Sequence, residues 1–376
     1  MNNQTTVREP LFHVANRSSM SIWYKTIIYA VAIVAALFLG GIICSIVASG
    51  NPFSFFSSLF KGILETSRKR WVFFRDTALL ICVSMALVPA FKMKFWNLGA
   101  NGQILMGGLA TATCMFYLGK AIDNGTLVMS EGMIIVIMAV ASIAVSVIWS
   151  VIPALLKVFF NANETLLTLM MNYVATGLVS FCIANWVRSG SGTLPLLTHG
   201  NVPGIINQHF LIILVGIVTT VFMFIYLRFT KHGYELSVVG DSPNTARYVG
   251  MKVKKVVIRT MVLSGVICGI IGFLLVGAIG HTVGANTVNN RGFTAIMTTW
   301  LANCNPIFIV LSCLLVTFIN KGMEQVRMDF GMTNDSTANL IIGIVYFFII
   351  ACAFFIKYRV IFRKKEHNTK KESVEQ

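Results

Sequence analysis

The chain has 376 residues, of which 56% are apolar and only 12% are charged, and its formal net charge is +16. Soluble domains carry about 25% charged residues, so this composition excludes an ordinary soluble globule. A positive charge of this size in a soluble chain would suggest nucleic-acid binding. Here the basic residues lie between long apolar stretches, where membrane orientation and anionic lipid explain them better. The composition indicates a polytopic membrane protein that contacts membrane lipid and no nucleic acid.

Nine long stretches contain no Asp, Glu, Lys or Arg, and most exceed the roughly 20 apolar residues that a membrane helix needs. The segment 291–304 is too short to cross alone, so we expect a broken or re-entrant helix that other protein segments surround. Gly265, Gly269 and Gly272 predict close helix packing in the seventh segment. The predicted fold is all-α, a polytopic membrane helical bundle of about ten segments: 26–48, 71–91, 100–119, 132–156, 165–187, 209–229, 257–280, 291–304, 306–320 and 338–357.

Ten segments would place both termini on one side of the membrane. With that side inside, 20 Lys and Arg residues lie in cytoplasmic parts and ten lie outside, which satisfies the positive-inside rule. The basic cluster at 68–70 is an exception on the outside. The predicted organisation is a cytoplasmic tail over 1–25, a membrane domain over 26–358 that includes a cytoplasmic loop at 230–256, and a basic cytoplasmic tail over 359–376.

Two polar segments interrupt the apolar pattern and are the candidate substrate path. The first enters the third segment and the second enters the fifth, where positions 164, 168 and 172 share one helix face. Such a stripe either faces a water-filled path or bonds neighbouring helices, each bond contributing about 0.6–2 kcal/mol. Both interpretations remain open at this point. The candidate path residues are Asn97, Asn101, Gln103, Glu164, Thr168, Asn172 and Tyr173.

The long cytoplasmic loop predicts a short helix over 241–250. Asp241 or Ser242 can cap its start, Pro243 suits the first helical position and Gly250 suits the stop. A helix of two turns is marginal in water, so it needs a partner. Either lipid holds it through Lys252, Lys254 and Lys255, or it docks on a cytoplasmic protein.

Several kinds of chemistry find no support in the sequence. There is no phosphate-binding loop, no Cys-x-x-Cys pair and no close histidine pair, so we expect neither ATP hydrolysis by this chain nor a metal site. No catalytic constellation indicates an enzyme. We expect no acidic residue to lie deeper in the membrane than Glu164, at the mouth of the fifth segment. Ion-coupled carriers usually need an acidic residue or a histidine at membrane depth, so the sequence argues against this class. An ion-coupled carrier or a passive channel is the alternative from another class of function.

Three motifs resemble those of the inner-membrane permeases of bacterial ABC importers in the branched-chain amino acid, ribose and nucleoside superfamily. Residues 97–103 read NLGANGQ, 163–173 read NETLLTLMMNY and 240–250 read GDSPNTARYVG. The later sequence GFTAI at 292–296 and the pair at 305–306 also fit. The resemblance extends from about 70 to 360 and is closest to nucleoside and simple-sugar permeases.

The resemblance implies a multi-pass protein of the bacterial inner membrane with both termini in the cytoplasm. It also implies a second permease subunit, identical or different, an extracytoplasmic binding protein or lipoprotein, and a separate ATPase subunit. ATP and Mg would bind to that ATPase, so this chain would hold no cofactor. The loop 230–256 would couple to the ATPase through the following residues: Asp241, Ser242, Pro243, Ala246, Arg247, Tyr248 and Gly250.

The implied function is nucleoside import, with a simple sugar or riboflavin as alternative substrates. Asn101 stands where the nucleoside branch usually has Glu, which leaves the choice among these substrates open. The candidate path residues other than Glu164 are neutral, and Trp96 could add a ring. A charged substrate would require Arg or Lys at membrane depth. The sequence therefore favours an uncharged polar solute over an amino acid or a nucleotide.

Overall fold

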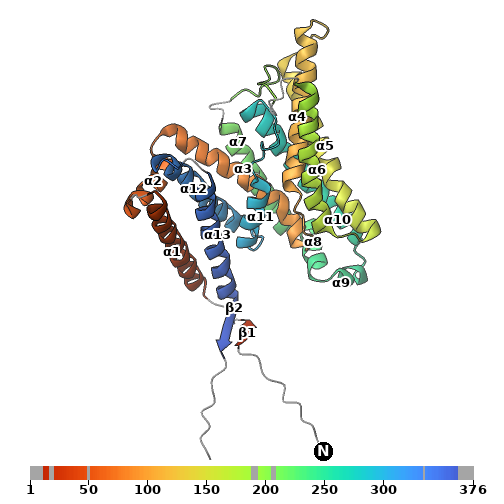
Figure 1. Ribbon diagram of the computed structural model, residues 1–376. Helices are drawn as coiled ribbons and strands as arrows, with labels where there is room; N and C mark the ends of the chain where they lie inside the picture. Colours follow the sequence, from red (N-terminus) through yellow and green to blue (C-terminus); the bar gives the residue numbers. More distant parts are fainter. Residues whose placement is uncertain are drawn as a thin grey trace, which may run out of the picture. The chain divides into compact units, whose positions relative to one another are not determined.

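The computed structural model describes residues 12–16, 21–48, 51–187, 194–204, 209–332 and 335–362 (Figure 1). Most of this part is helical, which confirms the predicted helical bundle. The remainder includes two short strands, β1 (Phe12–Asn16) and β2 (Tyr358–Phe362), which pair antiparallel. Contacts divide the chain into two units, residues 1–61 with 322–376, and residues 62–321.

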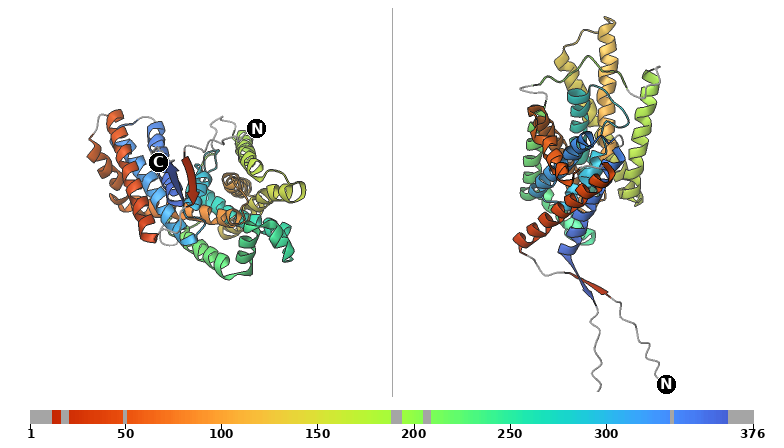
Figure 2. Two further views of the ribbon diagram at one scale, coloured as in Figure 1. Left: turned by 90° about the horizontal axis from the view of Figure 1, so that it is seen from below. Right: turned by 60° about the vertical axis from the view of Figure 1, so that its left-hand side comes forward.

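The first unit brings the two ends of the described chain together. Helix α1 (Ile22–Ala48) packs against α13 (Asp335–Lys357), and β1 and β2 lie side by side beyond them (Figures 1 and 2). The predicted segments 26–48 and 338–357 lie within these helices. Most of the predicted terminal tails lies outside the described residues.

Helix α2 (Pro52–Leu64) has no counterpart among the predicted segments. Its buried residues Phe55, Leu59 and Ile63 recur every four positions, whereas Phe53 and Phe60 are exposed. Its 13 residues are too few to cross a bilayer. The helix was missed because its apolar residues continue the charge-free stretch of the first segment.

The second unit contains most of the membrane-length helices. In the described residues, seven helices are long and apolar enough to cross a membrane. They coincide with seven predicted segments, but the last extends beyond the predicted end into charged residues. The seven are α3 (Ser67–Lys92), α4 (Ala100–Asp123), α5 (Glu131–Phe160), α6 (Glu164–Trp186), α7 (Phe210–Phe229), α10 (Val253–Leu274) with its π-helical continuation Leu275–Gly280, and α12 (Pro306–Asp329).

Small residues let α4, α5 and α10 approach closely, as the glycines of the seventh segment predict. Ser142 Oγ of α5 lies 2.9 Å from the carbonyl oxygen of Gly107 in α4 and 2.8 Å from that of Gly269 in α10. A Cβ atom on Gly269 would lie 2.7 Å from the Cα of Ile143. Backbone contact of this kind replaces the hydrophobic driving force that helices lack in lipid.

The segment after α10 is a broken crossing. At its start, the carbonyl oxygen of His281 accepts a hydrogen bond from Leu197 N at 2.9 Å, near the C-terminal end of α4. At its end, Trp300 stacks on Trp96, just before the N-terminal end of α4, with 4.9 Å between ring centroids. Turns over 285–290 and helix α11 (Arg291–Leu301) therefore connect opposite ends of the unit. The short segment predicted at 291–304 is thus the helical half of a crossing.

Candidate functional site

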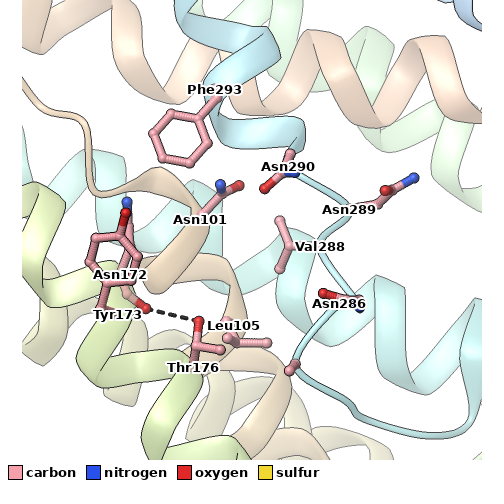
Figure 3. A pocket seen from close by; sticks show the side chains of 11 residues that line it. Asn101, Leu105, Asn172, Tyr173, Thr176, Asn286, Val288, Asn289, Asn290 and Phe293 are labelled. Carbon is pink, nitrogen blue, oxygen red and sulfur yellow. Dashed lines mark hydrogen bonds between the residues drawn. The ribbon is translucent and has the colours of Figure 1, made fainter. Parts of the chain in front are cut away.

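A cavity of about 240 Å³ lies where α4 and α6 face the broken crossing (Figure 3). None of its lining residues carries a charge; they are chiefly amides, with aromatic and small apolar side chains. The lining residues are Asn101, Leu105, Asn172, Tyr173, Thr176, Ala285, Asn286, Val288, Asn289, Asn290 and Phe293. Such a wall can hydrogen-bond and stack on an uncharged polar solute.

The asparagines of the broken crossing allow the chain to turn beside the cavity. Asn289 and Asn290 have φ angles of 49° and 55°, in the left-handed region that Asn tolerates better than most residues. The Asn289 N–H donates to the carbonyl oxygen of Asn286 at 2.9 Å. Irregular backbone at membrane depth occurs where it is buried in protein or lines a cavity, and broken helices are typical of substrate sites in transporters.

Asn101 joins the first turns of two helices at the cavity. Its Oδ1 accepts a hydrogen bond from the backbone N–H of Gly292 at 2.7 Å, so it links α4 to α11. An added Cβ at position 292 would lie 2.6 Å from the same oxygen and 2.7 Å from the backbone nitrogen of Asn101, so the close approach of the two helices requires glycine.

Asn172 and Thr168 bond α6 to the entry of α4. Asn172 Oδ1 accepts from Gly102 N at 2.8 Å, and its Nδ2 donates to the Leu98 carbonyl oxygen at 2.9 Å. Thr168 Oγ1 accepts from Leu98 N at 3.1 Å, and the side chain is fully buried. These contacts support the interpretation that the polar stripe on α6 bonds a neighbouring helix, although Asn172 also lines the cavity.

Asn97 and Gln103 form a buried network behind the cavity. Gln103 Nε2 donates to Asn97 Oδ1 at 3.3 Å, Asn97 Nδ2 donates to Ser264 Oγ at 3.3 Å, and Ser264 Oγ donates to Gln103 Oε1 at 3.2 Å. Glu164 lies elsewhere, in an ion pair with Lys157 at 2.8 Å.

The structure therefore divides the seven candidate path residues into three groups. Asn101, Asn172 and Tyr173 line the cavity. Three others are buried in the contacts around it, and Glu164 lies outside it. The asparagines at 286, 289 and 290 were missed, although three amides in a short stretch between apolar segments are a signal that a sequence reading could have used.

The sequence also did not predict a buried ion cluster. Asp76 of α3 is 8% exposed and lies 2.9 Å from Arg75, 3.1 Å from Lys321 and 3.7 Å from Arg291. It lies inside a membrane-length helix, so the expectation that no acid lies deeper than Glu164 is corrected. The pair Arg75-Asp76 within the predicted segment 71–91 was the available signal. Because Arg291 begins α11, the cluster ties the broken crossing to α3.

The predicted loop helix exists but is shorter, and a second helix precedes it. Ser242, not Asp241, caps α9 (Pro243–Tyr248): its Oγ accepts from Thr245 N at 3.2 Å. Asp241 ends α8 (Lys231–Asp241) instead. Gly250 follows with a φ of 79°, as a helix stop requires.

Helix α8 is fixed to the helical bundle and presents α9 (Figure 1). Gly240 packs so closely on the Lys92 carbonyl oxygen that a Cβ would overlap it. Glu235 pairs with Arg259 of α10 at 2.9 Å. Burial alone would raise the pKa of Glu235, but the hydrogen bonds and charges of Arg259 and His232 outweigh burial and lower it. On α9, Ala246 is buried, whereas Tyr248 is 93% exposed.

A bundle of membrane-length helices around an uncharged cavity at a broken crossing defines a solute permease. The chain belongs to the family described as "Branched-chain amino acid transport system / permease component", whose pattern matches residues 72–350. This family membership agrees with the resemblance carried by the three motifs.

Three relatives are similar over most of their length. The guanosine ABC transporter permease protein NupP of Bacillus subtilis is 24% identical, over 85% of this chain and 91% of the relative. The glucose ABC transporter permease protein TsgB13 of Haloferax volcanii is 24% identical over 92% of each chain. The nucleoside ABC transporter permease protein NupB of Lactococcus lactis is 25% identical, over 89% of this chain and 92% of the relative. No solved structure matches the chain.

Proposed function

We propose that the chain is the transmembrane permease subunit of an ATP-driven ABC importer for nucleosides, and that the cavity holds the solute during passage. The uncharged lining of the cavity carries this proposal. A phosphate or carboxylate would need a cation to compensate its charge, whereas ribose hydroxyls and a planar base need amides and aromatic faces. Two relatives with nucleoside or guanosine in their names support the same substrate class.

A simple sugar is the second candidate, because the similar protein TsgB13 is a glucose permease. The rings of Tyr173 and Phe293 in the cavity wall favour a planar base over a sugar alone. Riboflavin is the larger molecule, and a cavity of about 240 Å³ favours the smaller solutes.

The energy for uptake would come from a separate ATPase subunit that docks on α9. The exposed side chains of Tyr248 and Val249 support this role, since an apolar surface at the end of a short, isolated helix needs a partner. We propose the same coupling role for Arg247. A second permease subunit, an extracytoplasmic binding protein, and cytoplasmic placement of both termini complete the proposal.

The coupling proposal is tested by Arg247→Glu in the assembled importer. We expect normal membrane insertion but loss of ATP-dependent uptake, because the charge reversal lies on the exposed side of α9. Lys231→Glu provides the matched control, since it reverses an exposed charge in the same loop outside α9. Wild-type uptake by Arg247→Glu would count against docking through this helix.

The substrate proposal is tested by uptake into proteoliposomes with and without the ATPase. We expect ATP-dependent uptake of a labelled nucleoside and its loss in Tyr173→Ala. Phe181→Ala is the matched control, because Phe181 lies on the same helix, is 67% exposed against 68% for Tyr173, and lies outside the cavity. If glucose or riboflavin competes while inosine and adenosine do not, the nucleoside assignment falls and the permease assignment survives.

A further inference from the structure

The side-chain amide of Asn101 has a fixed orientation. The backbone N–H of Gly292 can only donate, so the Asn101 atom that faces it at 2.7 Å must be the oxygen. The Nδ2 group, which carries two N–H donors, then points to the other side of the amide. In the described part of the chain this nitrogen donates to no other group, and Asn101 lines the cavity (Figure 3).

Two polar neighbours of Asn101, on α6, have already used their donor groups. Asn172 uses its oxygen for Gly102 N and its nitrogen for the Leu98 carbonyl oxygen. Thr176 donates its hydroxyl hydrogen to the carbonyl oxygen of Asn172 at 3.0 Å, which leaves it only as an acceptor. Among the cavity-lining residues of α4 and α6, Asn101 is therefore the one whose side-chain amide is oriented so that its N–H groups can donate to a solute.

Two helix N-termini reinforce this donor character. Helix α4 begins at Ala100 and α11 begins at Arg291, so both first turns lie beside Asn101. The partial positive charge at each helix start favours an atom with partial negative charge. Phe293 in the first turn of α11 and Tyr173 of α6 add ring surfaces to the same wall (Figure 3).

We infer that Asn101 donates a hydrogen bond to a carbonyl oxygen on the planar ring of the solute, and so determines a preference for oxo-substituted over amino-substituted purine nucleosides. The inference rests on the proposed function. Inosine and adenosine differ in this respect at ring position 6: inosine presents a carbonyl oxygen there, whereas adenosine presents an amino group that also donates. With adenosine, the Nδ2 group of Asn101 would face the 6-amino group, which is also a donor. The hydrogen bond between Asn101 and the solute would then be missing, which reduces binding about tenfold or more.

The test compares inosine and adenosine uptake by the assembled importer, with the same binding protein and ATPase in every sample. We expect the wild type to favour inosine by about tenfold. Asn101→Asp keeps an acceptor for Gly292 N–H but replaces the donor by a second oxygen, so the inosine-to-adenosine ratio should fall at least tenfold. Asn185→Asp is the matched control: it makes the same change from amide to carboxylate at an exposed position of α6 outside the cavity, and it should leave the ratio unchanged.

Asn101→Ala supplies a second measurement if the Asp variant does not accumulate in the membrane. Removal of the donor should bring the ratio close to one through reduced inosine uptake. An unchanged ratio in both Asn101 variants, or an equal change in Asn185→Asp, would overturn the specificity role while nucleoside uptake itself continues. Absence of uptake of either nucleoside by the wild type would instead refute the proposed function.

Discussion

Gly272 is a position where one added methyl group should force two packed helices of the bundle apart. A Cβ there would lie 2.5 Å from the carbonyl oxygen of Ile104, 2.6 Å from Gly108 N and 2.9 Å from the carbonyl carbon of Gly107. All three are backbone atoms of α4, so no side chain can rotate away. Gly272→Ala must therefore separate α10 from α4.

The expected size follows from two opposing effects. Overpacking costs about 1–3 kcal/mol, and close contact with three backbone atoms of α4 places this site at the upper end. Alanine in place of glycine within a helix recovers about 0.5–1 kcal/mol. We expect a net loss of about 2 kcal/mol for Gly272→Ala.

Thermal unfolding of the purified protein in lipid nanodiscs measures this effect. Gly177→Ala in α6 is the matched control, because a Cβ there meets nothing within 4 Å. The control should unfold at or slightly above the wild-type temperature, whereas Gly272→Ala should unfold clearly below it. Equal unfolding temperatures for Gly272→Ala and the wild type would refute the argument that backbone contact joins α4 and α10.

Three further predictions follow from burial and charge. In a cysteine-free background, Tyr173→Cys should react with polar thiol reagents and be protected by the solute, whereas the fully buried Thr168→Cys should stay inert; labelling of both would contradict the contacts of α6. The pKa of Glu235 is lowered, so its pairing with Arg259 stabilises the fold fully at pH values above the ordinary Glu pKa. This stabilisation is lost as the pH falls through the lowered pKa, so the difference in unfolding temperature between wild type and Glu235→Gln should shrink in acid. Hydrogen bonds to Glu131 and Asp123 raise the pKa of His199, so these bonds stabilise the fold fully at pH values below the ordinary His pKa, and the stabilisation is lost as the pH rises through the raised pKa. His199→Gln should therefore abolish the loss of stability over this pH range, and an unchanged dependence of the unfolding temperature on pH would contradict the prediction.

The sequence was sufficient for features that depend on local composition. Membrane-length helices follow from uninterrupted apolar stretches, and α9 follows from Ser242, Pro243 and Gly250, which each satisfy one backbone requirement of a short helix. The shortness of 291–304 was also visible. The sequence did not show that this segment is half of a crossing, because that depends on contacts with residues far away in the chain, such as those of His281 with Leu197 and of Trp300 with Trp96.

The cavity itself could be predicted only in part, since it forms between segments that are far apart in the chain. Gly292 and Asn101, which are joined by a hydrogen bond, are 191 positions apart. Helix α8 was missed for a related reason. Its sequence is weakly amphipathic, and it is held by the fit of Gly240 against α3 and by the ion pair of Glu235 with Arg259. Neither contact leaves a periodic pattern in the sequence.

The two interpretations of the polar stripe, a path lining or a set of helix contacts, do not exclude each other. Asn172 lines the cavity, yet its oxygen and nitrogen both bond the entry of α4, so its amide has little capacity left for a solute. Asn101 gives only its oxygen to α11 and keeps its nitrogen for the cavity. The residue type is the same in both cases, and both lie in apolar helices. What separates a structural amide from a recognising one is the number of polar atoms that remain unused after the helices have packed, and that number depends on tertiary contacts alone.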